Sequence, residues 1–374
     1  MTKIVIDANC LAWDWGGIPK YVDRIVRELA RDETLEIELL ANASGPFSEI
    51  EGVRQRWRRV RGGAAWRNGF VLPVLARARP DVFWAPQGLT PVHVPVPSVV
   101  TLHDLAPLLF PGTKPWRETL AYRTNMRRSA RRADRVLAVS ATTAADARRL
   151  WGLREERLRV VPNGVDAAFT PGDRAAAAEA VRARFGLGGR YVLHVGALDP
   201  RKGLDVLFDA AERAWAAGDG WRLALAGSPG FGSEAQLARL EGAPWCALLG
   251  RVSDAELLAL YRAAEALAAP AIYEGFGIPP VEAMACGTPP VIAANSGGLE
   301  EVSGTASVVV SERTAEAWRM GISEAFHRRA ELGAAGAALA SSYRWDDVAT
   351  RTRQVLLEAM LRTSSGGLSR HGMS

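Results

Sequence analysis

Two glutamates in a stretch rich in glycine and proline are the residues of this sequence best suited to bind a polar ligand. Glu274 and Glu282 lie in the segment 269–291, APAIYEGFGIPPVEAMACGTPPV. Glycine and proline exclude a helix before about Pro279, so we expect Glu274 in a loop and a short helix from Pro279 to Cys286. Glu274 then lies outside the positive end of that helix, and Glu282 on its first turns. Carboxylates beside exposed N–H groups predict a site for a polyhydroxylated anionic ligand.

Two cations and a histidine follow predicted strands, at the carboxyl ends where parallel sheets bind ligands. The segment GALDPRKG, residues 196–203, follows a predicted strand and brings Arg201 and Lys202 to the start of a helix. Two cations at such a place favour a phosphate site over a plain surface role. His103 follows the predicted strand 99–102, and ligands bind at the carboxyl ends of parallel strands. Two interpretations of His103 stay open, a structural histidine and a site residue.

A glycine pair near the N-terminus offers a further phosphate contact. Gly16 and Gly17 lie between a predicted strand at residues 3–7 and a predicted helix at residues 19–31. A strand, a glycine loop and a helix point backbone N–H groups at a phosphate, although paired glycines are also common in turns. No GxGxxG motif follows the strand, which argues against a dinucleotide-dependent oxidoreductase.

Length and composition indicate ordinary globular domains. The chain has 374 residues, 48% of them hydrophobic and 23% charged, which predicts two or three domains. No apolar run reaches the roughly 18 residues of a membrane span. The N-terminus also lacks the pattern of a signal peptide, so we expect a cytoplasmic protein. Cys10, Cys246, Cys286 and the five histidines show no metal-ligand spacing, so we expect buried, reduced cysteines and no metal site.

The basic residues are concentrated in the first half of the chain. Residues 1–170 carry 26 Lys and Arg against 18 Asp and Glu, a net charge of +8, and the remainder carries 20 against 23, or −3. The predicted helix 116–135 places its arginines on one half of a helical projection: Arg123, Arg127, Arg128, Arg131, Arg132 and Arg135. This face is either a solvated surface or a peripheral contact with an anionic membrane or a phosphorylated lipid acceptor. Only four of the 46 basic residues are lysine, so arginine richness is weak evidence for nucleic acid, and we expect no nucleic-acid partner.

Two series of strands alternate with helical segments and predict two Rossmann-like halves. This alternation is typical of an α/β fold with parallel sheets covered on both faces and ligands in the cleft between the halves. The predicted strands are residues 3–7, 36–41, 54–60, 81–85, 99–102, 135–139 and 157–161, then 191–195, 221–226, 246–249, 267–269, 290–293 and 307–310. We expect a first domain at 1–168, a second at 169–345, a last helix at 346–362 that joins the first domain, and a disordered tail at 363–374.

Several motifs along most of the chain resemble the retaining glycosyltransferases of family 4, which have the GT-B fold. The most specific motif is the EGFGIPPVE run with EAMACG after it. The others are GGIPKYV at 16–22, LHDLAPLLFP at 102–111, VSATTAADA at 139–147, PNGVD at 162–166, VGALDPRKG at 195–203 and LLGRVSDAELLALY at 248–261. The resemblance implies two Rossmann-like domains, the first binding the acceptor and the second the nucleotide sugar, with the final helix crossing back to the first.

The resemblance also implies a role for each matching residue. Gly16, Gly17 and Gly196 would contact the donor, Arg201 and Lys202 would neutralise its diphosphate, and Glu282 would hold the ribose. Glu274, Gly275, Phe276, Gly277 and Ile278 would hold the donor sugar, His103 would face the reacting sugar, and Arg251 and Val252 would lie near the base. Many family members carry an arginine where this chain has Ala197, so Arg201 would supply that cation here.

The expected function is therefore retaining transfer of a hexose from a nucleotide diphosphate to a glycan, a lipid-linked glycan or a small molecule. The PRK and HDLAP strings resemble bacterial mannosyl- and rhamnosyl-type transferases, which favours GDP-mannose as donor. The cations at residues 201 and 202 predict that neither a metal nor any other cofactor is needed. A glycosidase would not require them. Two further alternatives are an accessory protein that binds nucleotide sugars without turnover, and a nucleic-acid-binding module suggested only by the basic first half.

Overall fold

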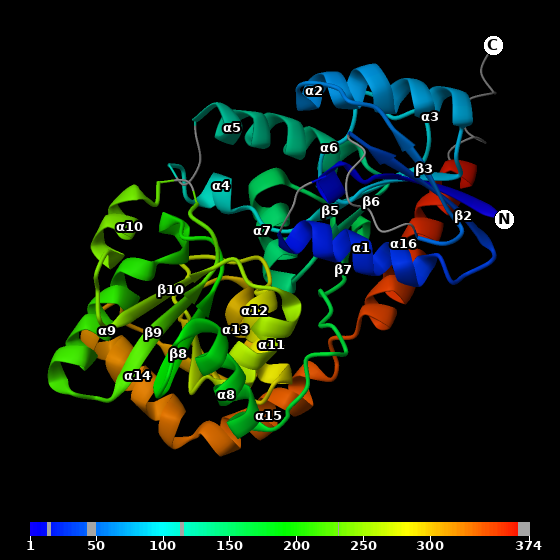
Figure 1. Ribbon diagram of the computed structural model, residues 1–374. Helices are drawn as coiled ribbons and strands as arrows, with labels where there is room; N and C mark the ends of the chain where they lie inside the picture. Colours follow the sequence, from blue (N-terminus) through cyan, green and yellow to red (C-terminus); the bar gives the residue numbers. More distant parts are fainter. Residues whose placement is uncertain (13–15, 43–49, 113–115, 231, 366–374) are drawn as a thin grey trace, which may run out of the picture. The chain divides into compact units, whose positions relative to one another are not determined.

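A computed structural model describes residues 1–12, 16–42, 50–112, 116–230 and 232–365 of this chain. The chain forms two compact units (Figure 1). Unit 1 contains residues 1–109, 116–164 and Trp345 to the C-terminus, and unit 2 contains residues 110–115 and 165–344. Each unit is built on its own parallel sheet, so we describe them one after the other.

Unit 1 contains a seven-stranded parallel sheet of order β3-β2-β1-β4-β5-β6-β7. Its strands are β1 (Thr2–Asp7), β2 (Leu35–Ala41), β3 (Val53–Trp57), β4 (Val82–Ala85), β5 (Ser98–Leu102), β6 (Arg135–Ala138) and β7 (Leu158–Val160). Its helices are α1 (Gly17–Leu29), α2 (Gly63–Ala65), α3 (Leu72–Ala78), α4 (Ala106–Leu109), α5 (Trp116–Ala121), α6 (Arg127–Arg132), α7 (Ala141–Trp151) and α16 (Trp345–Ser365). All seven predicted strands of this half are confirmed, with shifted ends. The largest shift is at β3, which ends at Trp57.

Unit 2 repeats the same strand order in a six-stranded parallel sheet, β10-β9-β8-β11-β12-β13. Its strands are β8 (Arg190–Val195), β9 (Trp221–Ala226), β10 (Cys246–Gly250), β11 (Ala266–Ala269), β12 (Pro290–Ala293) and β13 (Val308–Val310). Its helices are α8 (Arg174–Phe185), α9 (Leu204–Ala217), α10 (Glu234–Leu240), α11 (Asp254–Ala263), α12 (Ile278–Ala285), α13 (Gly298–Ser303), α14 (Ala315–His327) and α15 (Arg329–Ala340). All six predicted strands are confirmed, and two Rossmann-like sheets follow.

In both sheets the strand order reverses beside the first strand. In each unit the first strand lies between the second and the fourth, so the chain crosses from one side of the sheet to the other at β1/β4 and at β8/β11. Loops diverge at such a switch point and leave a crevice at the carboxyl ends of the strands. The sequence predicts its polar residues at these strand ends.

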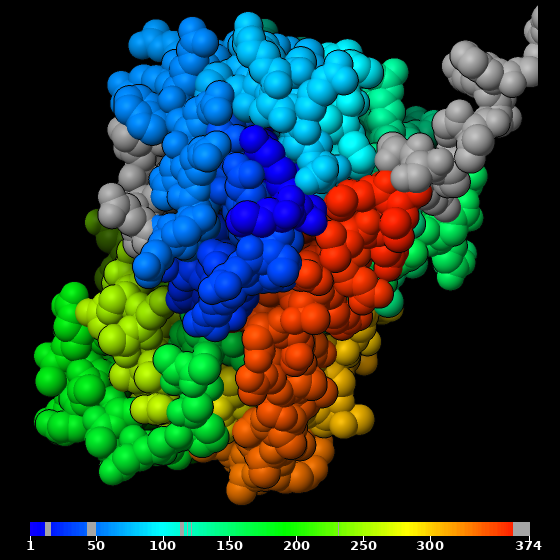
Figure 2. Space-filling view, turned by 90° about the vertical axis from the view of Figure 1, so that its right-hand side faces the viewer, coloured from blue at the N-terminus to red at the C-terminus, as the bar shows by residue number. Residues whose placement is uncertain are grey.

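The C-terminal helix α16 joins unit 1, as predicted. Helix α16 packs against α1, and its Val355, Leu356 and Ala359 share a buried core with Ile4 and Ile6 of β1. Figure 2 shows α16, in red, against the blue N-terminal part of unit 1. The helix ends at Ser365 rather than at residue 362, and the rest of the predicted tail, 366–374, lies outside the described residues.

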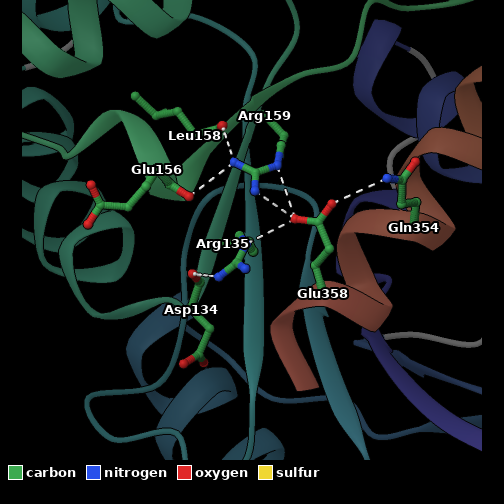
Figure 3. A network of polar contacts seen from close by, with 7 residues as sticks. All are labelled: Asp134, Arg135, Glu156, Leu158, Arg159, Gln354 and Glu358. Carbon is green, nitrogen blue, oxygen red and sulfur yellow. Dashed lines mark hydrogen bonds and ion pairs between the residues drawn. The ribbon is translucent and has the colours of Figure 1, made fainter. Parts of the chain in front are cut away.

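A buried ion-pair network fixes α16 to the sheet of unit 1 (Figure 3). Glu358 Oε2 accepts hydrogen bonds from Arg135 Nε of β6, at 3.2 Å, and from Arg159 Nε of β7, at 3.0 Å. The Arg135 side chain is only 9% exposed. A buried guanidinium needs such a partner, because an unpaired charge away from water is costly.

The predicted arginine helix 116–135 is shorter and less regular than expected. Helices α5 and α6 are joined by a π-helical segment, Tyr122–Met126, and α6 ends at Arg132. Arg135 was wrongly placed on the arginine face, because it belongs to β6 and is buried. The side chains of Arg123, Arg127, Arg131 and Arg132 are exposed, and Arg128 is half-buried. None of the described helices combines the length and apolar character needed to cross a bilayer.

Candidate functional site

The first part of the candidate site is the turn between β8 and α9 in unit 2. Asp199 begins this turn and accepts a hydrogen bond from the backbone N–H of Arg201 at 2.7 Å. Gly203 ends it with φ of 64°, and a Cβ there would lie 2.4 Å from the Pro270 carbonyl oxygen, so only glycine fits. Helix α9 begins at the next residue. Arg201 and Lys202 therefore lie at a helix start, as the sequence predicted.

Glu274 lies against these two cations. Lys202 Nζ donates to Glu274 Oε1, and Arg201 Nη1 lies 3.7 Å from the same oxygen. Arg201 Nη1 also donates to the Tyr273 carbonyl oxygen at 2.9 Å. The three charged side chains are 16% to 17% exposed. Burial acts to raise the pKa of Glu274, but Lys202 and Arg201 outweigh burial and hold it below its usual value. Glu274 is thus an ionised hydrogen-bond acceptor and not a general acid.

Glycines hold the loop of Glu274 in place. Glu274 N donates to the Ser296 carbonyl oxygen at 3.0 Å, and Gly298 N donates to the Glu274 carbonyl oxygen at 2.7 Å. A Cβ on Gly298 would lie 2.3 Å from the Gly275 oxygen, and a Cβ on Gly277 would lie 2.3 Å from Leu299. Gly277 precedes α12 with φ of 96°, and no side chain caps this helix. Helix α12 therefore begins four residues after Glu274, close to the predicted start at residue 279, and Ile278 is the one residue before Val281 in its first turn that carries a backbone N–H.

Glu282 has a different environment from Glu274. It is 3% exposed and accepts a hydrogen bond from Tyr261 Oη of α11 at 2.9 Å. Thr288 Oγ1 in turn donates to the Tyr261 carbonyl oxygen at 2.5 Å. Burial and the neighbouring Glu282 raise the pKa of Tyr261 well above its usual value, so the phenol stays a hydrogen-bond donor. Tyr261 was not singled out from the sequence, where the motif ending in it gave no signal of this contact.

A small cavity lies beside Glu274 and Lys202. Its volume is about 20 Å³, and its lining includes His194, Lys202, Glu274, Gly277 and Leu299. This volume holds about one water molecule. Glu282 does not line this cavity.

His194 is a polar member of this group that sequence reasoning missed. It is 4% exposed, and its Nδ1 lies 2.9 Å from the Ala268 carbonyl oxygen. A carbonyl only accepts, so Nδ1 carries the proton and Nε2 is a lone-pair acceptor, which has no protein partner among the described residues. Burial lowers the pKa of His194 to about 4. The one available signal was a histidine inside the otherwise apolar strand YVLHV.

The remaining predicted donor residues of unit 2 also lie at the carboxyl side of the sheet. Gly196 follows β8, and a Cβ there would lie 3.5 Å from both His194 Nε2 and Lys202 Nζ. Arg251 and Val252 follow β10, before the capping box of Ser253 and Glu256 that begins α11. Phe276 is buried against Tyr343 with ring centroids 5.6 Å apart, and Ile278 is the first residue of α12.

The predicted residues of unit 1 lie at the carboxyl ends of β1 and β5. Gly16 precedes α1 with φ of 138°, Gly17 is the first residue of that helix, and residues 13–15 lie outside the described chain. His103 Nε2 donates to the Pro86 carbonyl oxygen at 2.8 Å, and its ring packs edge-on against Tyr21. Burial lowers the pKa of His103, so the ring is neutral.

Asp7 is a further buried acid of unit 1 that the sequence did not reveal. It ends β1, is 4% exposed, and accepts hydrogen bonds from Trp66 Nε1 at 3.0 Å and from Asn9 N at 3.2 Å. Burial raises the pKa of Asp7 to about 6 in spite of these bonds. Arg67 lies close enough to interact with Asp7 and with Arg128.

The charged groups of the structure do not form a metal-ligand cluster within the described residues. No three side chains of His, Cys, Asp or Glu gather there in a way that could hold an ion. The three cysteines are buried and unpaired, as expected.

The two parallel sheets and the returning helix define the GT-B class. Sucrose-phosphate synthase from Thermosynechococcus elongatus has the same fold, with a TM-score of 0.78 and 21% identity over 97% of this chain and 100% of that one. WaaG, a glycosyltransferase involved in lipopolysaccharide biosynthesis, matches with a TM-score of 0.75 and 16% identity over 95% and 99%. Anabaena HepE in complex with UDP-glucose matches with a TM-score of 0.73 and 20% identity over 98% and 100%.

Sequence comparisons identify the family within that class. The glycosyl transferases group 1 family matches residues 178–338, and the Glycosyltransferase Family 4 matches residues 15–169. A D-inositol 3-phosphate glycosyltransferase from Segniliparus rotundus is 32% identical over 85% of this chain and 70% of its own length. Another from Salinispora tropica is 36% identical over 67% of this chain and 57% of its own length. The chain belongs to the group 1, family 4 glycosyltransferases.

Proposed function

We propose that this protein is a retaining hexosyltransferase whose unit 2 binds a nucleotide-diphosphate sugar. The observation that supports this most is the group of Arg201, Lys202 and Glu274 at the carboxyl ends of β8 and β11. A departing diphosphate develops negative charge, and two fixed cations at the switch point stabilise it. Glu274, held ionised by the same cations, accepts hydrogen bonds from the hydroxyls of the donor sugar.

The other residues of unit 2 complete the donor site. The backbone N–H groups of Gly196, Gly277 and Ile278 bind phosphate and sugar oxygens, since Pro279 and Pro280 have no N–H to donate. Glu282 binds the ribose hydroxyls, with Tyr261 holding its carboxylate in place. Arg251 and Val252 lie beside the base. His194 Nε2, a lone-pair acceptor at the cavity beside Lys202, accepts a hydrogen bond from a water molecule there.

Unit 1 supplies the acceptor side of the reaction. His103, neutral and fixed by Pro86, faces the reacting sugar, and Gly16 and Gly17 contact the diphosphate. Asp7 and the half-buried Arg67 lie at the end of β1, where they suit an acceptor with hydroxyls and an anionic group. The similar D-inositol 3-phosphate glycosyltransferases support a phosphorylated polyol, and a glycan or lipid-linked acceptor is the second choice.

The donor is expected to be GDP-mannose, with UDP-glucose as the alternative supported by the fold of HepE. Arg201 and Lys202 replace a metal ion, so transfer needs no divalent cation. Activity that EDTA abolishes and magnesium restores would contradict this part of the proposal.

A thermal-shift panel of UDP, GDP, ADP and dTDP with their sugars tests the donor site, since a ligand of the native state raises Tm by mass action. Lys202→Ala should weaken binding of the preferred nucleoside diphosphate about 100-fold, because a charge-assisted contact to phosphate is lost. Lys3→Ala is the matched control, since Lys3 pairs only at a surface site with Glu36. A panel without any shift, or an equal shift in Lys202→Ala, would sink the proposal.

Turnover separates an enzyme from an accessory binding protein. Transfer of labelled sugar to inositol 3-phosphate, to myo-inositol or to a lipid-linked glycan is the readout. A preference for the phosphorylated acceptor that disappears in Arg67→Ala supports the acceptor assignment. Tight donor binding without transfer or hydrolysis under all three conditions would favour the accessory protein.

A further inference from the structure

A second cationic hollow lies in unit 2, apart from the residues of the donor site. Its volume is about 270 Å³. The arginine pocket, as we name it, is lined by the guanidinium-bearing residues Arg174, Arg262 and Arg329 and by Pro171, Gly172, Cys286, Gly287, Ala330, Gly333, Ala334 and Ala337. None of these residues lines the cavity beside Glu274. Helix α12 connects the two places, because it begins at the donor site and ends at Cys286 and Gly287. At 1.5 Å per residue they are separated by roughly 12 Å along that helix.

The arginine pocket carries an excess of positive charge. Its three arginines come from the start of α8, the last turn of α11 and the start of α15. The carboxylate that faces them is Glu265, which pairs with Arg174 at 2.5 Å and lies 3.7 Å from Arg329 Nε. Glu265 also forms an ion pair with Arg190 at 3.5 Å. The single negative charge of Glu265 is therefore shared by Arg174, Arg190 and Arg329. Asp173 precedes Arg174 in the sequence, and its carboxylate caps the N-terminus of α8.

The start of α15 adds positive partial charge at the pocket, and the acid of its first turn, Glu331, is paired with Arg328. Arg329 is the first residue of α15, a 12-residue helix whose N-terminus has no side-chain cap. The positive end of a helix dipole disfavours a cation. Burial lowers the pKa of Arg329, and the nearby Arg174 lowers it further. An anion bound among these groups would relieve both the repulsion between guanidinium groups and the conflict with the helix dipole.

Hydrogen bonds hold the guanidinium groups in place and leave some of their N–H donors available. Arg262 donates to the carbonyl and hydroxyl oxygens of Thr170, at 2.9 and 3.1 Å. Arg329 Nη2 donates to the Ala264 carbonyl oxygen at 3.0 Å. Each guanidinium has five N–H donors, more than these described partners accept. Preorganised N–H donors of this kind suit the oxygens of a phosphate group.

Glycines let the walls of the pocket pack closely. A Cβ on Gly172 would lie 2.7 Å from the Arg262 guanidinium carbon, and a Cβ on Gly333 would lie 2.5 Å from the Gly287 oxygen. Ala330, Ala334 and Ala337 of α15 also line the pocket. At about 30 Å³ per water molecule, the hollow has the space of roughly nine waters, enough for a small phosphorylated molecule.

We propose that the arginine pocket binds a phosphate group at a site distinct from the donor site. The shared chemistry is a dianionic phosphate group, carried by inorganic phosphate or by a phosphorylated sugar. The inference does not depend on the function proposed above, because its test measures binding and not transfer.

The test is calorimetric titration of the full chain with inorganic phosphate and with glucose 6-phosphate at constant ionic strength. Arg174→Gln should weaken binding about tenfold, and the double variant Arg174→Gln/Arg262→Gln about 100-fold, since each loses a charge-assisted contact. Arg184→Gln is the matched control on the same helix, because Arg184 pairs with Glu256 outside the pocket. Lys202→Ala, which removes a donor-site cation, should leave unchanged the component of phosphate binding that Arg174→Gln weakens.

Weaker binding by a variant could also result from loss of folding. A variant that is expected to bind phosphate more tightly avoids this ambiguity. Glu265→Gln removes the competing carboxylate and should strengthen binding severalfold. Tighter binding by glucose 6-phosphate than by phosphate identifies a phosphorylated sugar as the ligand class, and equal binding identifies the phosphate group alone. Absence of saturable binding, equal weakening by Arg184→Gln and Arg174→Gln, or loss of binding in Lys202→Ala would overturn the proposal.

Discussion

The two units share one strand order, but the pKa of a buried carboxyl group is lowered in unit 2 and raised in unit 1. In unit 2, Glu274 from the loop after β11 meets Lys202 and Arg201 from the turn after β8, and these cations lower its pKa. At the end of β1 in unit 1, Asp7 is hydrogen-bonded by neutral groups, and its pKa rises to about 6. The carboxyl edges of the two sheets therefore hold a carboxylate kept ionised by paired cations in unit 2 and an acid that ionises only near pH 6 in unit 1.

This difference shows that the scaffold fixes where polar groups gather and not how they are charged. Parallel strands bring loops to one edge of the sheet in both units. The sequence of each loop then decides whether a carboxylate finds a cation. The ionised cluster suits a site that binds a diphosphate. Asp7, with the Arg67 cation beside it, suits the hydroxylated, anionic acceptor that we propose.

The largest expected effect is on catalysis by the ionised cluster. Glu274→Gln should lower kcat/KM about 10²- to 10³-fold, because preorganised charge at the reacting sugar is lost while the size of the side chain is kept. Steady-state rates with the preferred donor give the answer. Glu324→Gln, which alters an exposed ion pair with Arg328, is the control. A loss of less than about tenfold would remove Glu274 from the catalytic group.

The next effect concerns a buried ion pair of unit 1. Glu358→Ala should lower the unfolding free energy of unit 1 by about 2 to 3 kcal/mol, because it leaves the buried Arg135 and the partly exposed Arg159 without their partner. Denaturant unfolding measures this loss, and Glu331→Ala, which removes an exposed pair with Arg328, should cost clearly less because solvent screens exposed ion pairs. Equal losses in the two variants would contradict the assignment.

The pH dependence of Glu358 follows from its lowered pKa. Burial opposes ionisation, but Arg135 and Arg159 prevail and the folded pKa lies below the unfolded one. The contribution of Glu358 is therefore present above the unfolded pKa and is lost as the pH falls through the folded pKa.

Asp7 and His194 should give opposite pH slopes in the two units. Asp7 has a folded pKa of about 6 against 3.8 unfolded, so unit 1 loses stability as the pH rises from about 4 to 6. His194 has a folded pKa of about 4 against 6.5 unfolded, so unit 2 loses stability as the pH falls from about 6.5 to 4. Each slope approaches 1.4 kcal/mol per pH unit.

Single variants separate these two slopes. Asp7→Asn keeps an oxygen for Trp66 and should remove the slope of unit 1, and His194→Asn keeps a donor for Ala268 and should remove that of unit 2. Melting temperatures between pH 4 and 6.5 are the measurement. Parallel curves for wild type and both variants would show that neither group titrates as described.

The smallest effect concerns surface charge, where unit 1 is the more basic. We expect Arg127→Gln to weaken sedimentation with anionic liposomes about fivefold, since one basic residue near a membrane contributes about 1 kcal/mol. Arg77→Gln, also exposed in unit 1, is the control. Binding that does not depend on anionic lipid would leave the exposed arginines as a solvated surface.

The sequence by itself determined the strand positions and the two-sheet architecture. Strands such as YVLHV and WRLALA are nearly continuous apolar runs, and such runs alternating with helices form parallel sheets covered on both faces. The motif PRKG and the loop of Glu274 were predicted as ligand contacts because cations and glycines beside strand ends have a local physical meaning. Arg135 was wrongly predicted on the helix because the helical spacing of the arginines continues past Arg132, where α6 ends.

Only the tertiary structure decided the charge state and partners of these residues. Lys202 and Glu274 are 72 positions apart, and Arg135 and Glu358 are 223 apart, so no local pattern reveals either pair. Burial sets the pKa of Asp7 and of His194 through the atoms packed around them, and these come from distant strands and helices. The arginine pocket arises in the same way, because three arginines that are unremarkable along the chain meet where α8, α11 and α15 come together.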